Sequence, residues 1–296
     1  MRTGLECLVC YVRQALAAAR ICTNDEDVQR QVVLRAGTLL GAVDMARTPP
    51  ENAVSLYRMI SEVTGREDPF AEVKKKSNLF ALSIVDAIGE QIRQADDPLR
   101  SALHFAVCAN IIDYAAQHSF DAARAMEECS GKRFVVDAYA GLRQAVEQNP
   151  GCRILYLADN CGEIAVDGLA IRELQRLGCK VTLAVRGGPI INDATREDAV
   201  FCGLDTICPI IENGCDCPGT PLAACSGELR RHFREADIIL SKGMGNFETL
   251  SDVRAPLFFL FTVKCVRVAD YLNGVYANKG ISFAGKGEMV CMEQNR

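Results

Sequence analysis

The stretch RILYLADNCGE, residues 153–163, decides the fold class because it joins a short apolar run to a cluster of polar residues. The run 153–158 is almost continuously apolar, which is typical of a strand buried on both faces of a sheet. Asp159, Asn160 and Glu163 follow at the point where that strand would end. Ligands bind beyond the carboxyl ends of strands in an open α/β sheet, so this turn is the first candidate for a functional site.

The same pattern recurs along the second half of the chain, where short apolar runs alternate with stretches of helical periodicity. The predicted strands are RILYLA at 153–158, KVTLAV at 180–185, TICPII at 206–211, DIIL at 237–240 and LFFLFTV at 257–263. The predicted helices between them lie at 164–177, 194–201 and 228–235. This alternation predicts an α/β fold with a mainly parallel sheet that helices cover on both faces.

The first half of the chain instead shows apolar residues at helical spacing, without long β-branched runs. Helices are predicted at 25–46, 51–64, 70–92, 99–116 and 135–146. Asn24 is a candidate N-cap, and Pro98 suits the first turn of a helix. We therefore divide the chain into an all-helical domain at 1–149 and an α/β domain at 150–296.

Composition excludes several classes of protein. The 296 residues are 49% hydrophobic and 24% charged, which are ordinary globular values, and the net charge of −5 disfavours nucleic-acid binding. No apolar run reaches the roughly 18 residues that a membrane span needs. The 15 cysteines are an odd number and no signal-peptide core is evident, so we expect mostly reduced thiols and a cytoplasmic location.

Asp159, Asn160 and Asp193 form a set of oxygen ligands at the ends of two predicted strands. Hard divalent cations such as Mg²⁺ and Mn²⁺ bind carboxylate and amide oxygens. Helix capping is the alternative explanation: Asn160 would form a capping box with Glu163. Asp193 would likewise cap the helix that starts near Ala194. Acids at the ends of two predicted strands favour the metal site over two separate caps.

Lysines and glycines at the strand ends suggest an anion site. Lys242 and Lys264 follow predicted strands, and lysine binds phosphate as a point charge. Gly187 and Gly243 belong to turns whose N–H groups can face an anion. Taken singly, these are ordinary turn glycines and surface lysines. Beside the acids they favour a phosphorylated ligand, although the chain has neither a P-loop nor a complete dinucleotide-binding fingerprint.

Asn110 and Asp113 are two polar residues on an otherwise apolar predicted helix. Their spacing of three places both on one face, and buried polar groups need partners. They either bond to a neighbouring helix end or face the strand-end site, and both explanations stay open.

Cys7-x-x-Cys10 opens the chain but has no convincing second half as a zinc site, because Cys215-x-Cys217 is one residue short of the usual spacing. We interpret Cys7 and Cys10 as packed thiols on the first helix, with a metal role as the lesser alternative.

The ordered motifs resemble the domain-of-unknown-function-89 family, whose members are called damage-control phosphatases. The similarity is carried by LADNCGEIAVDGLAI at 157–171, VRGGPIINDATREDA at 185–199, CDCPGTPLAACSGEL at 215–229 and ADIILSKGMGNFETL at 236–250. The Cys7-x-x-Cys10 motif and CANIIDY at 108–114 resemble the prokaryotic CxxC-bearing branch of that family.

The resemblance implies a Rossmann-like three-layer α/β/α domain preceded by a helical domain. It also implies hydrolysis of phosphate monoesters with a divalent metal, typically Mn²⁺, Co²⁺, Ni²⁺ or Mg²⁺. The functional positions of the family fall on the metal ligands Asp159, Asn160 and Asp193, the helix residues Asn110 and Asp113, the strand-end Lys264, and Lys242 and Glu248 of a Lys-Gly-x-Gly-Asn-x-Glu stretch.

Together these observations predict a metal-dependent phosphatase that acts on a small phosphorylated metabolite and needs neither nucleic acid nor membrane. Asn110, Lys242 and Lys264, with the N–H groups of the two glycine turns, would hold the phosphate oxygens. Asp113 or Glu248 would act as the base or as the acid that protonates the leaving group.

Other functions remain open from the sequence. A carboxylate methyltransferase would need a glycine-rich loop after the first sheet strand, which Asn160-Cys161-Gly162 fits poorly. A non-catalytic binder of phosphorylated metabolites would keep the lysines and glycines but would not need metal ligands. Within the phosphatase mechanism, a covalent aspartyl-phosphate on Asp159 is the lesser alternative to a role for Asp159 in holding the metal.

Overall fold

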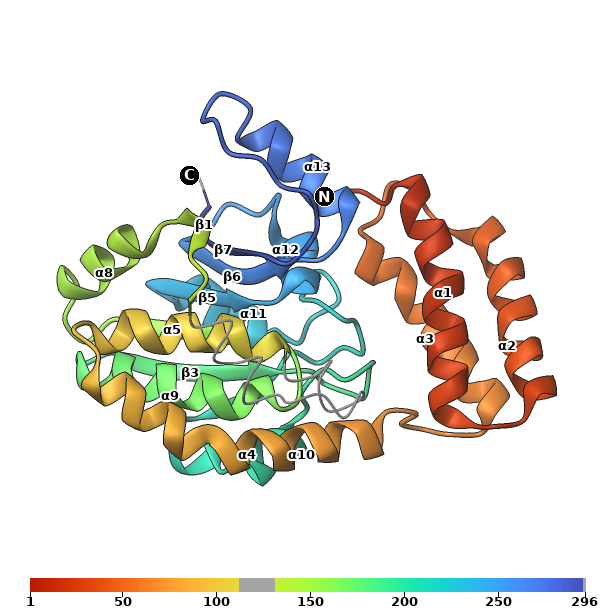
Figure 1. Ribbon diagram of the computed structural model, residues 1–296, viewed down its shortest axis with the longest axis horizontal. Helices are drawn as coiled ribbons and strands as arrows, with labels where there is room; N and C mark the ends of the chain where they lie inside the picture. The colour runs from red at the N-terminus through yellow and green to blue at the C-terminus, as the bar shows by residue number, and fades with distance from the viewer. Residues whose placement is uncertain (112–130, 295–296) are drawn as a thin grey trace.

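A seven-stranded sheet lies at the centre of this computed structural model, which describes residues 1–111 and 131–294 (Figure 1). The strands are β1 (Phe134–Asp137), β2 (Arg153–Leu157), β3 (Lys180–Val185), β4 (Ile210–Glu212), β5 (Ile238–Lys242), β6 (Leu257–Val263) and β7 (Glu288–Glu293). Their order is β1-β7-β6-β5-β2-β3-β4, and only the β6–β7 pairing is antiparallel. The predicted α/β fold with a mainly parallel sheet is confirmed.

Helices cover both faces of the sheet, which makes three layers. The helices that pack into the first hydrophobic core are α4 (Ala71–Gln94), α5 (Pro98–Cys108), α8 (Tyr139–Glu147), α9 (Glu163–Arg176) and α10 (Arg196–Phe201). The second core holds α11 (Gly227–Glu235), α12 (Met244–Leu250) and α13 (Val266–Val275). In β2, Ile154 and Tyr156 face the first core while Leu155 and Leu157 face the second. Two buried faces explain why this strand is apolar at every one of these positions.

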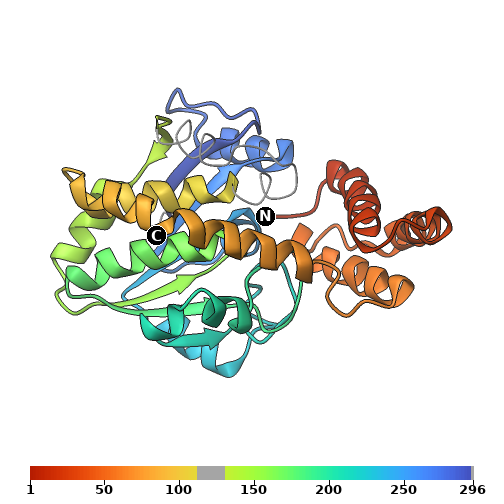
Figure 2. The same cartoon turned by 60° about the horizontal axis from the view of Figure 1, so that its bottom comes forward.

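Three helices form a lobe beside the sheet (Figures 1 and 2). They are α1 (Leu5–Cys22), α2 (Glu26–Leu39), which continues into the short η1 (Leu40–Ala42), and α3 (Pro49–Thr64). The lobe has its own hydrophobic core, and Ile190 from the loop after β3 is buried in it. This loop therefore ties the lobe to the carboxyl end of the sheet. Among the described residues, no helix combines the length and the apolarity that crossing a membrane requires.

The prediction that residues 1–149 are all helical is wrong. The start of the predicted helix at 135–146 is β1, which pairs with β7 near the other end of the chain. Helix α8 begins only at Tyr139. In addition, α4 and α5 pack against α9, so they belong to the layer that covers the sheet rather than to a separate helical unit. The sheet and the helices that cover it therefore include elements from both sides of residue 150.

Two smaller predictions also need correction. The run at 206–211 is a strand only from Ile210, because Leu204–Thr206 forms the 3₁₀ turn η3 instead. Asp25 rather than Asn24 caps α2, since its carboxylate accepts the N–H groups of Asp27 and Val28.

The chain order places a crevice at the carboxyl ends of β2 and β5. From β2 the chain passes through α9 on one face to β3, whereas from β5 it passes through α12 on the other face to β6. Adjacent strands whose connections leave toward opposite faces mark the usual ligand-binding position of an open α/β sheet.

Candidate active site

A cavity of about 300 Å³ lies at this position, between the helical lobe and the ends of the strands. Its lobe side is formed by α1 and α3, including Cys7, Cys10, Tyr11 and Pro50. The structure brings six of the predicted site residues to its wall, namely Asn110, Asp159, Asn160, Asp193, Glu248 and Lys264. Asp113 lies outside the described residues.

The three predicted metal ligands meet in this wall. Asp159 and Asn160 follow β2, and Asn160 forms an isolated antiparallel bridge with Asp193 from the loop after β3. The capping alternatives are wrong for both residues, because α9 has Gly162 at its N-cap and α10 has Thr195. The side chains of Asn160 and Asp193 are therefore not used at a helix end.

Both carboxyl groups of this cluster are buried, and burial disfavours their ionised forms. Burial raises the pKa of Asp159 well above its usual range, and the negative charges of Asp193 and Glu163 add to this shift. Burial also raises the pKa of Asp193, against the opposing charge of Arg186. Ionised carboxylates at such positions are stabilised by a cation that binds between them.

The side chains of this cluster offer oxygen ligands, which are the kind that hard divalent cations bind. Within residues 1–111 and 131–294, no group of three or more His, Cys, Asp or Glu side chains is arranged to hold a metal. A cation here would be bound by two carboxylates, the amide oxygen of Asn160 and water. This is the oxygen-only, partly hydrated shell that Mg²⁺ and Mn²⁺ accept.

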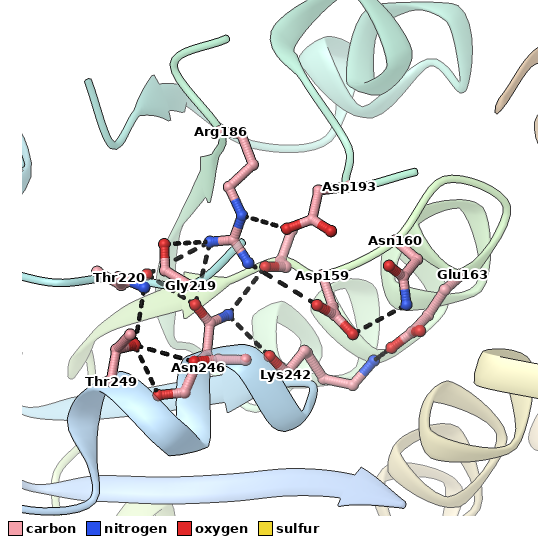
Figure 3. Close-up of polar contacts among 12 residues, drawn as sticks. Asp159, Asn160, Glu163, Arg186, Asp193, Gly219, Thr220, Lys242, Asn246 and Thr249 are labelled. Carbon is pink, nitrogen blue, oxygen red and sulfur yellow. Dashed lines mark hydrogen bonds and ion pairs between the residues drawn. The ribbon is translucent and has the colours of Figure 1, made fainter. Parts of the chain in front are cut away.

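Arg186 is a site residue that the sequence analysis did not single out, although it directly follows β3. Its guanidinium is buried and donates from Nε to Asp193 Oδ2 at 2.6 Å (Figure 3). Nη1 donates to Asn246 Oδ1 at 3.0 Å and to the Gly219 carbonyl at 3.1 Å. Nη2 has no hydrogen-bond partner among the residues that the structure describes, and it lies 3.8 Å from Asp159 Oδ1. Arg186 thus holds one of the two candidate metal ligands, Asp193, and faces the other, Asp159.

We expect Asp193→Asn to destabilise the protein as well as the metal site, because it leaves the buried Arg186 without its carboxylate. Breaking a buried ion pair on one side costs about 3–5 kcal/mol. Denaturant titration would measure the free energy of unfolding. The double variant Arg186→Met/Asp193→Asn should recover part of the loss, and an unchanged single variant would contradict the importance of this pair.

The prediction that Lys242 binds phosphate is contradicted by its surroundings. Its side chain is fully buried at the end of β5 and does not line the cavity. Nζ donates to the Ala106 carbonyl at 3.0 Å, to Asp167 Oδ1 at 2.7 Å and to Glu163 Oε1. All three N–H bonds of the ammonium group are used, so none is left for a ligand.

The two predicted glycine N–H groups are also occupied. Gly187 N donates to Asn213 Oδ1 at 2.9 Å, and Gly243 N donates to the Leu260 carbonyl at 3.1 Å. Neither residue lines the cavity. Gly243 serves the site differently: its φ is 81°, and a Cβ at this position would overlap the Asp159 carboxylate. Close approach to the carboxylate of Asp159, rather than anion binding, explains this glycine.

Lys264 and Glu248 lie where a phosphate ester could meet them. Lys264 is exposed at the end of β6, with Nζ 3.4 Å from the Asn110 carbonyl. Among the described residues in the cavity wall it is the single lysine or arginine. Glu248 is buried on α12, and burial raises its pKa to about 8. The cavity wall therefore combines the ammonium group of Lys264, the Glu248 carboxyl group as a proton donor at neutral pH, and the candidate metal site.

Comparison with known proteins identifies the family of this chain. Residues 3–278 match the model of the damage-control phosphatase ARMT1-like domain. The chain belongs to this family.

Two relatives of the same family cover almost the whole chain. A damage-control phosphatase of Pyrococcus horikoshii is 32% identical over 99% of this chain and 98% of its own. One of Archaeoglobus fulgidus is 33% identical over 91% of this chain and 94% of its own. The crystal structure of a DUF89 family protein from Pyrococcus horikoshii superposes with a TM-score of 0.88, at 30% identity and full coverage of both chains. The predicted family and fold are confirmed, and the names of the relatives support a phosphatase role.

In this ARMT1-like family member, the CxxC motif lies in the cavity wall. Cys7 Sγ accepts the N–H of Gly4 at 3.5 Å, and Cys10 Sγ accepts Gln14 Nε2 at 3.4 Å. Burial raises the pKa of both thiols, which keeps them protonated. Their placement fits packed thiols that form part of a pocket wall, and membership of the CxxC-bearing branch stays a prediction.

Proposed function

We propose that this protein is a divalent-metal-dependent phosphatase that hydrolyses phosphate monoesters of small metabolites. The observation that carries the proposal is the cavity wall itself, where the Asp159–Asn160–Asp193 cluster and Lys264 line the same space of about 300 Å³. A volume of this size accepts a phosphoryl group with a small leaving group.

The residues divide the chemistry among them. Asp159, Asn160 and Asp193 would hold the cation, and a bound cation would supply Lewis-acid polarisation of a phosphoryl oxygen. Lys264 would neutralise negative charge that develops on the phosphoryl oxygens. Glu248, protonated at neutral pH, would give its proton to the leaving oxygen.

A metal and substrate screen tests the proposal. The purified protein is assayed with p-nitrophenyl phosphate and a panel of sugar and other metabolite phosphates, each with Mn²⁺, Co²⁺, Ni²⁺ or Mg²⁺. We expect turnover that needs one of these metals and stops on chelation. Phosphate binding without turnover, and without any effect of metal, would identify a non-catalytic binder instead.

We expect Glu248→Gln to slow hydrolysis of alkyl phosphates by about 100-fold, because general-acid catalysis contributes roughly that factor or more. Hydrolysis of p-nitrophenyl phosphate should change little, since p-nitrophenolate leaves without a proton. Wild-type activity on alkyl phosphates should also decline above about pH 8, where Glu248 ionises. The variant Glu235→Gln on α11 is the control. Equal losses on both substrate types would remove Glu248 from the role of acid.

Ile191 is placed to limit the size of the substrate. It is a β-branched residue with φ of 46°, in the left-handed region that costs such residues about 1–3 kcal/mol. Its side chain lines both the active-site cavity and a second cavity of about 300 Å³ beside Tyr57 and Phe70. Ile191 is thus shared by the walls of both cavities, and we infer that its side chain separates them.

Ile191→Gly is expected to join the cavities and relieve the backbone strain. The ratio of kcat/KM for 1-naphthyl phosphate to that for phenyl phosphate should rise by about tenfold, a typical effect of removing a few methylene groups from a pocket wall. Ile191→Val keeps the partition and is the control. A ratio that stays at the wild-type value would show that Ile191 does not set substrate size.

A further inference from the structure

Behind the cavity lies a buried charge cluster that the proposed chemistry does not use directly. It consists of Lys242, Glu163 and Asp167, all of them 2% exposed or less. Lys242 bonds to both acids, and Asp167 Oδ1 also accepts the hydroxyl of Tyr156 at 2.7 Å. Burying three ionised groups is costly, and the cost is offset only where each charge is paired.

One of the two acids, Glu163, is linked to the cavity wall by its hydrogen bond to the Asn110 amide. Glu163, the first residue of α9, binds Lys242 through Oε1 and accepts Asn110 Nδ2 through Oε2 at 2.7 Å. Asn110 comes from the 3₁₀ turn η2 (Ala109–Ile111) that follows α5, and it lines the cavity. Its Oδ1 accepts the hydroxyl of Thr262 at 3.2 Å. The Asn110 amide is therefore held at both ends.

The held amide faces the metal site with its nitrogen. Asn110 Nδ2 lies 3.5 Å from Asp159 Oδ2, at the limit of a hydrogen bond. Glu163 takes one N–H of the amide, and the other makes this long bond to Asp159. A phosphoryl oxygen bound beside Asp159 would be a closer acceptor for the second N–H.

We infer that Glu163, itself held by Lys242, is a positioning residue that orients the Asn110 amide toward the phosphoryl group of the substrate. This inference rests on the proposed phosphatase function. Lys242 then does not bind phosphate itself but holds Glu163, and Figure 3 shows the ion pair between the two residues.

A carboxylate is required at position 163 for a simple reason. Its two oxygens accept from two different donors, Lys242 Nζ and Asn110 Nδ2. A glutamine has one oxygen, which the ammonium group would take, and its NH₂ group would then face the NH₂ group of Asn110. Two donors in contact repel, so the amide of Asn110 would turn away from its position.

The chain offers a matched control for this substitution. Glu163→Gln and Asp167→Asn each remove one buried negative charge next to Lys242, but only Glu163 contacts Asn110. We expect Glu163→Gln to lower kcat by about 10- to 100-fold per folded molecule, the usual cost of losing an outer-shell partner. Asp167→Asn should stay within about threefold of the wild type. Equal losses in the two variants would assign the cluster to the stability of the fold and overturn the inference.

A double-mutant cycle with Asn110→Ala provides the second readout. If Glu163 acts through Asn110, Glu163→Gln should add no further loss of kcat once Asn110 is alanine. Full additivity would overturn the inference. If Glu163→Gln does not fold, Thr262→Val serves instead, because it removes the hydrogen bond at the other end of the Asn110 amide. Thr262→Val should lower kcat by the same factor when introduced into the wild type, and should not lower it further when introduced into Asn110→Ala.

A phosphate-binding measurement separates the inference from the proposed function. Calorimetric titration of inorganic phosphate in the presence of Mn²⁺ should show weaker binding for Glu163→Gln and unchanged binding for Asp167→Asn. If the three proteins bind phosphate in this pattern but the wild type hydrolyses no ester, the proposed phosphatase function is refuted and the positioning role of Glu163 is kept. Identical phosphate affinities in the wild type and both variants would refute the positioning role.

Discussion

Asp159→Asn is expected to abolish metal-dependent turnover while the protein stays folded. Asp159 is a central member of the candidate cation site, and its neighbours tolerate an amide. Asn160 Nδ2 donates to Asp159 Oδ2 at 2.9 Å, and the oxygen of an asparagine side chain can accept the same bond. Arg186 keeps its shorter contact to Asp193 at 2.6 Å. The substitution therefore removes one ligand charge with little change in packing.

The size of the effect follows from the ligand set. In the described part of the chain the candidate cation site has two carboxylate ligands, Asp159 and Asp193, so removing one should weaken Mn²⁺ binding by at least about 100-fold, more than the loss of an outer-shell partner. Mn²⁺ affinity is measured by calorimetry, and turnover by hydrolysis of p-nitrophenyl phosphate. Asp216→Asn, which makes the same chemical change outside the active-site cavity, should match the wild type in both assays. Wild-type turnover of Asp159→Asn at saturating Mn²⁺ would show that the metal binds elsewhere.

The sequence allowed Asp159, Asn160 and Asp193 to be found because the signal is local. An apolar strand followed by polar residues marks a strand end, and strand ends of a parallel sheet share one edge. The structure places these residues together in one wall for that reason. Lys264 was found by the same logic, since it directly follows the apolar run of β6.

What the sequence did not reveal depends on contacts between distant segments. The role of Lys242 is set by Glu163 and Asp167, which lie 79 and 75 positions away. A strand-end lysine has the same local pattern whether it points into a cavity or into a buried charge cluster. Gly243 is similar, because its space is filled by the carboxylate of Asp159. The strand β1 was taken for helix because its pairing partner, β7, lies near the far end of the chain.

Lys264→Met should reduce kcat/KM by about 100- to 1000-fold, which is the usual loss when one preorganised donor to a developing oxyanion is removed. Lys264 is the single lysine or arginine among the described residues of the cavity wall, so no neighbour there can replace its charge. The side chain is exposed, and among the described residues it makes one hydrogen bond, of 3.4 Å, to the Asn110 carbonyl. The methionine variant should therefore fold like the wild type, with the thermal melting temperature as the measure.

The same variant distinguishes a role in binding phosphate from a role in holding the metal. Because Lys264 is a cation, its removal should leave Mn²⁺ affinity unchanged or raise it, in contrast to Asp159→Asn. Lys264→Arg should restore part of the activity, since the charge is kept and only the geometry of the donor changes. Lys279→Met, on the turn after α13 and outside the cavity wall, is the matched control. A large loss of Mn²⁺ affinity in Lys264→Met, or a loss of activity equal to that of Lys279→Met, would contradict the assignment of Lys264 to the phosphoryl oxygens.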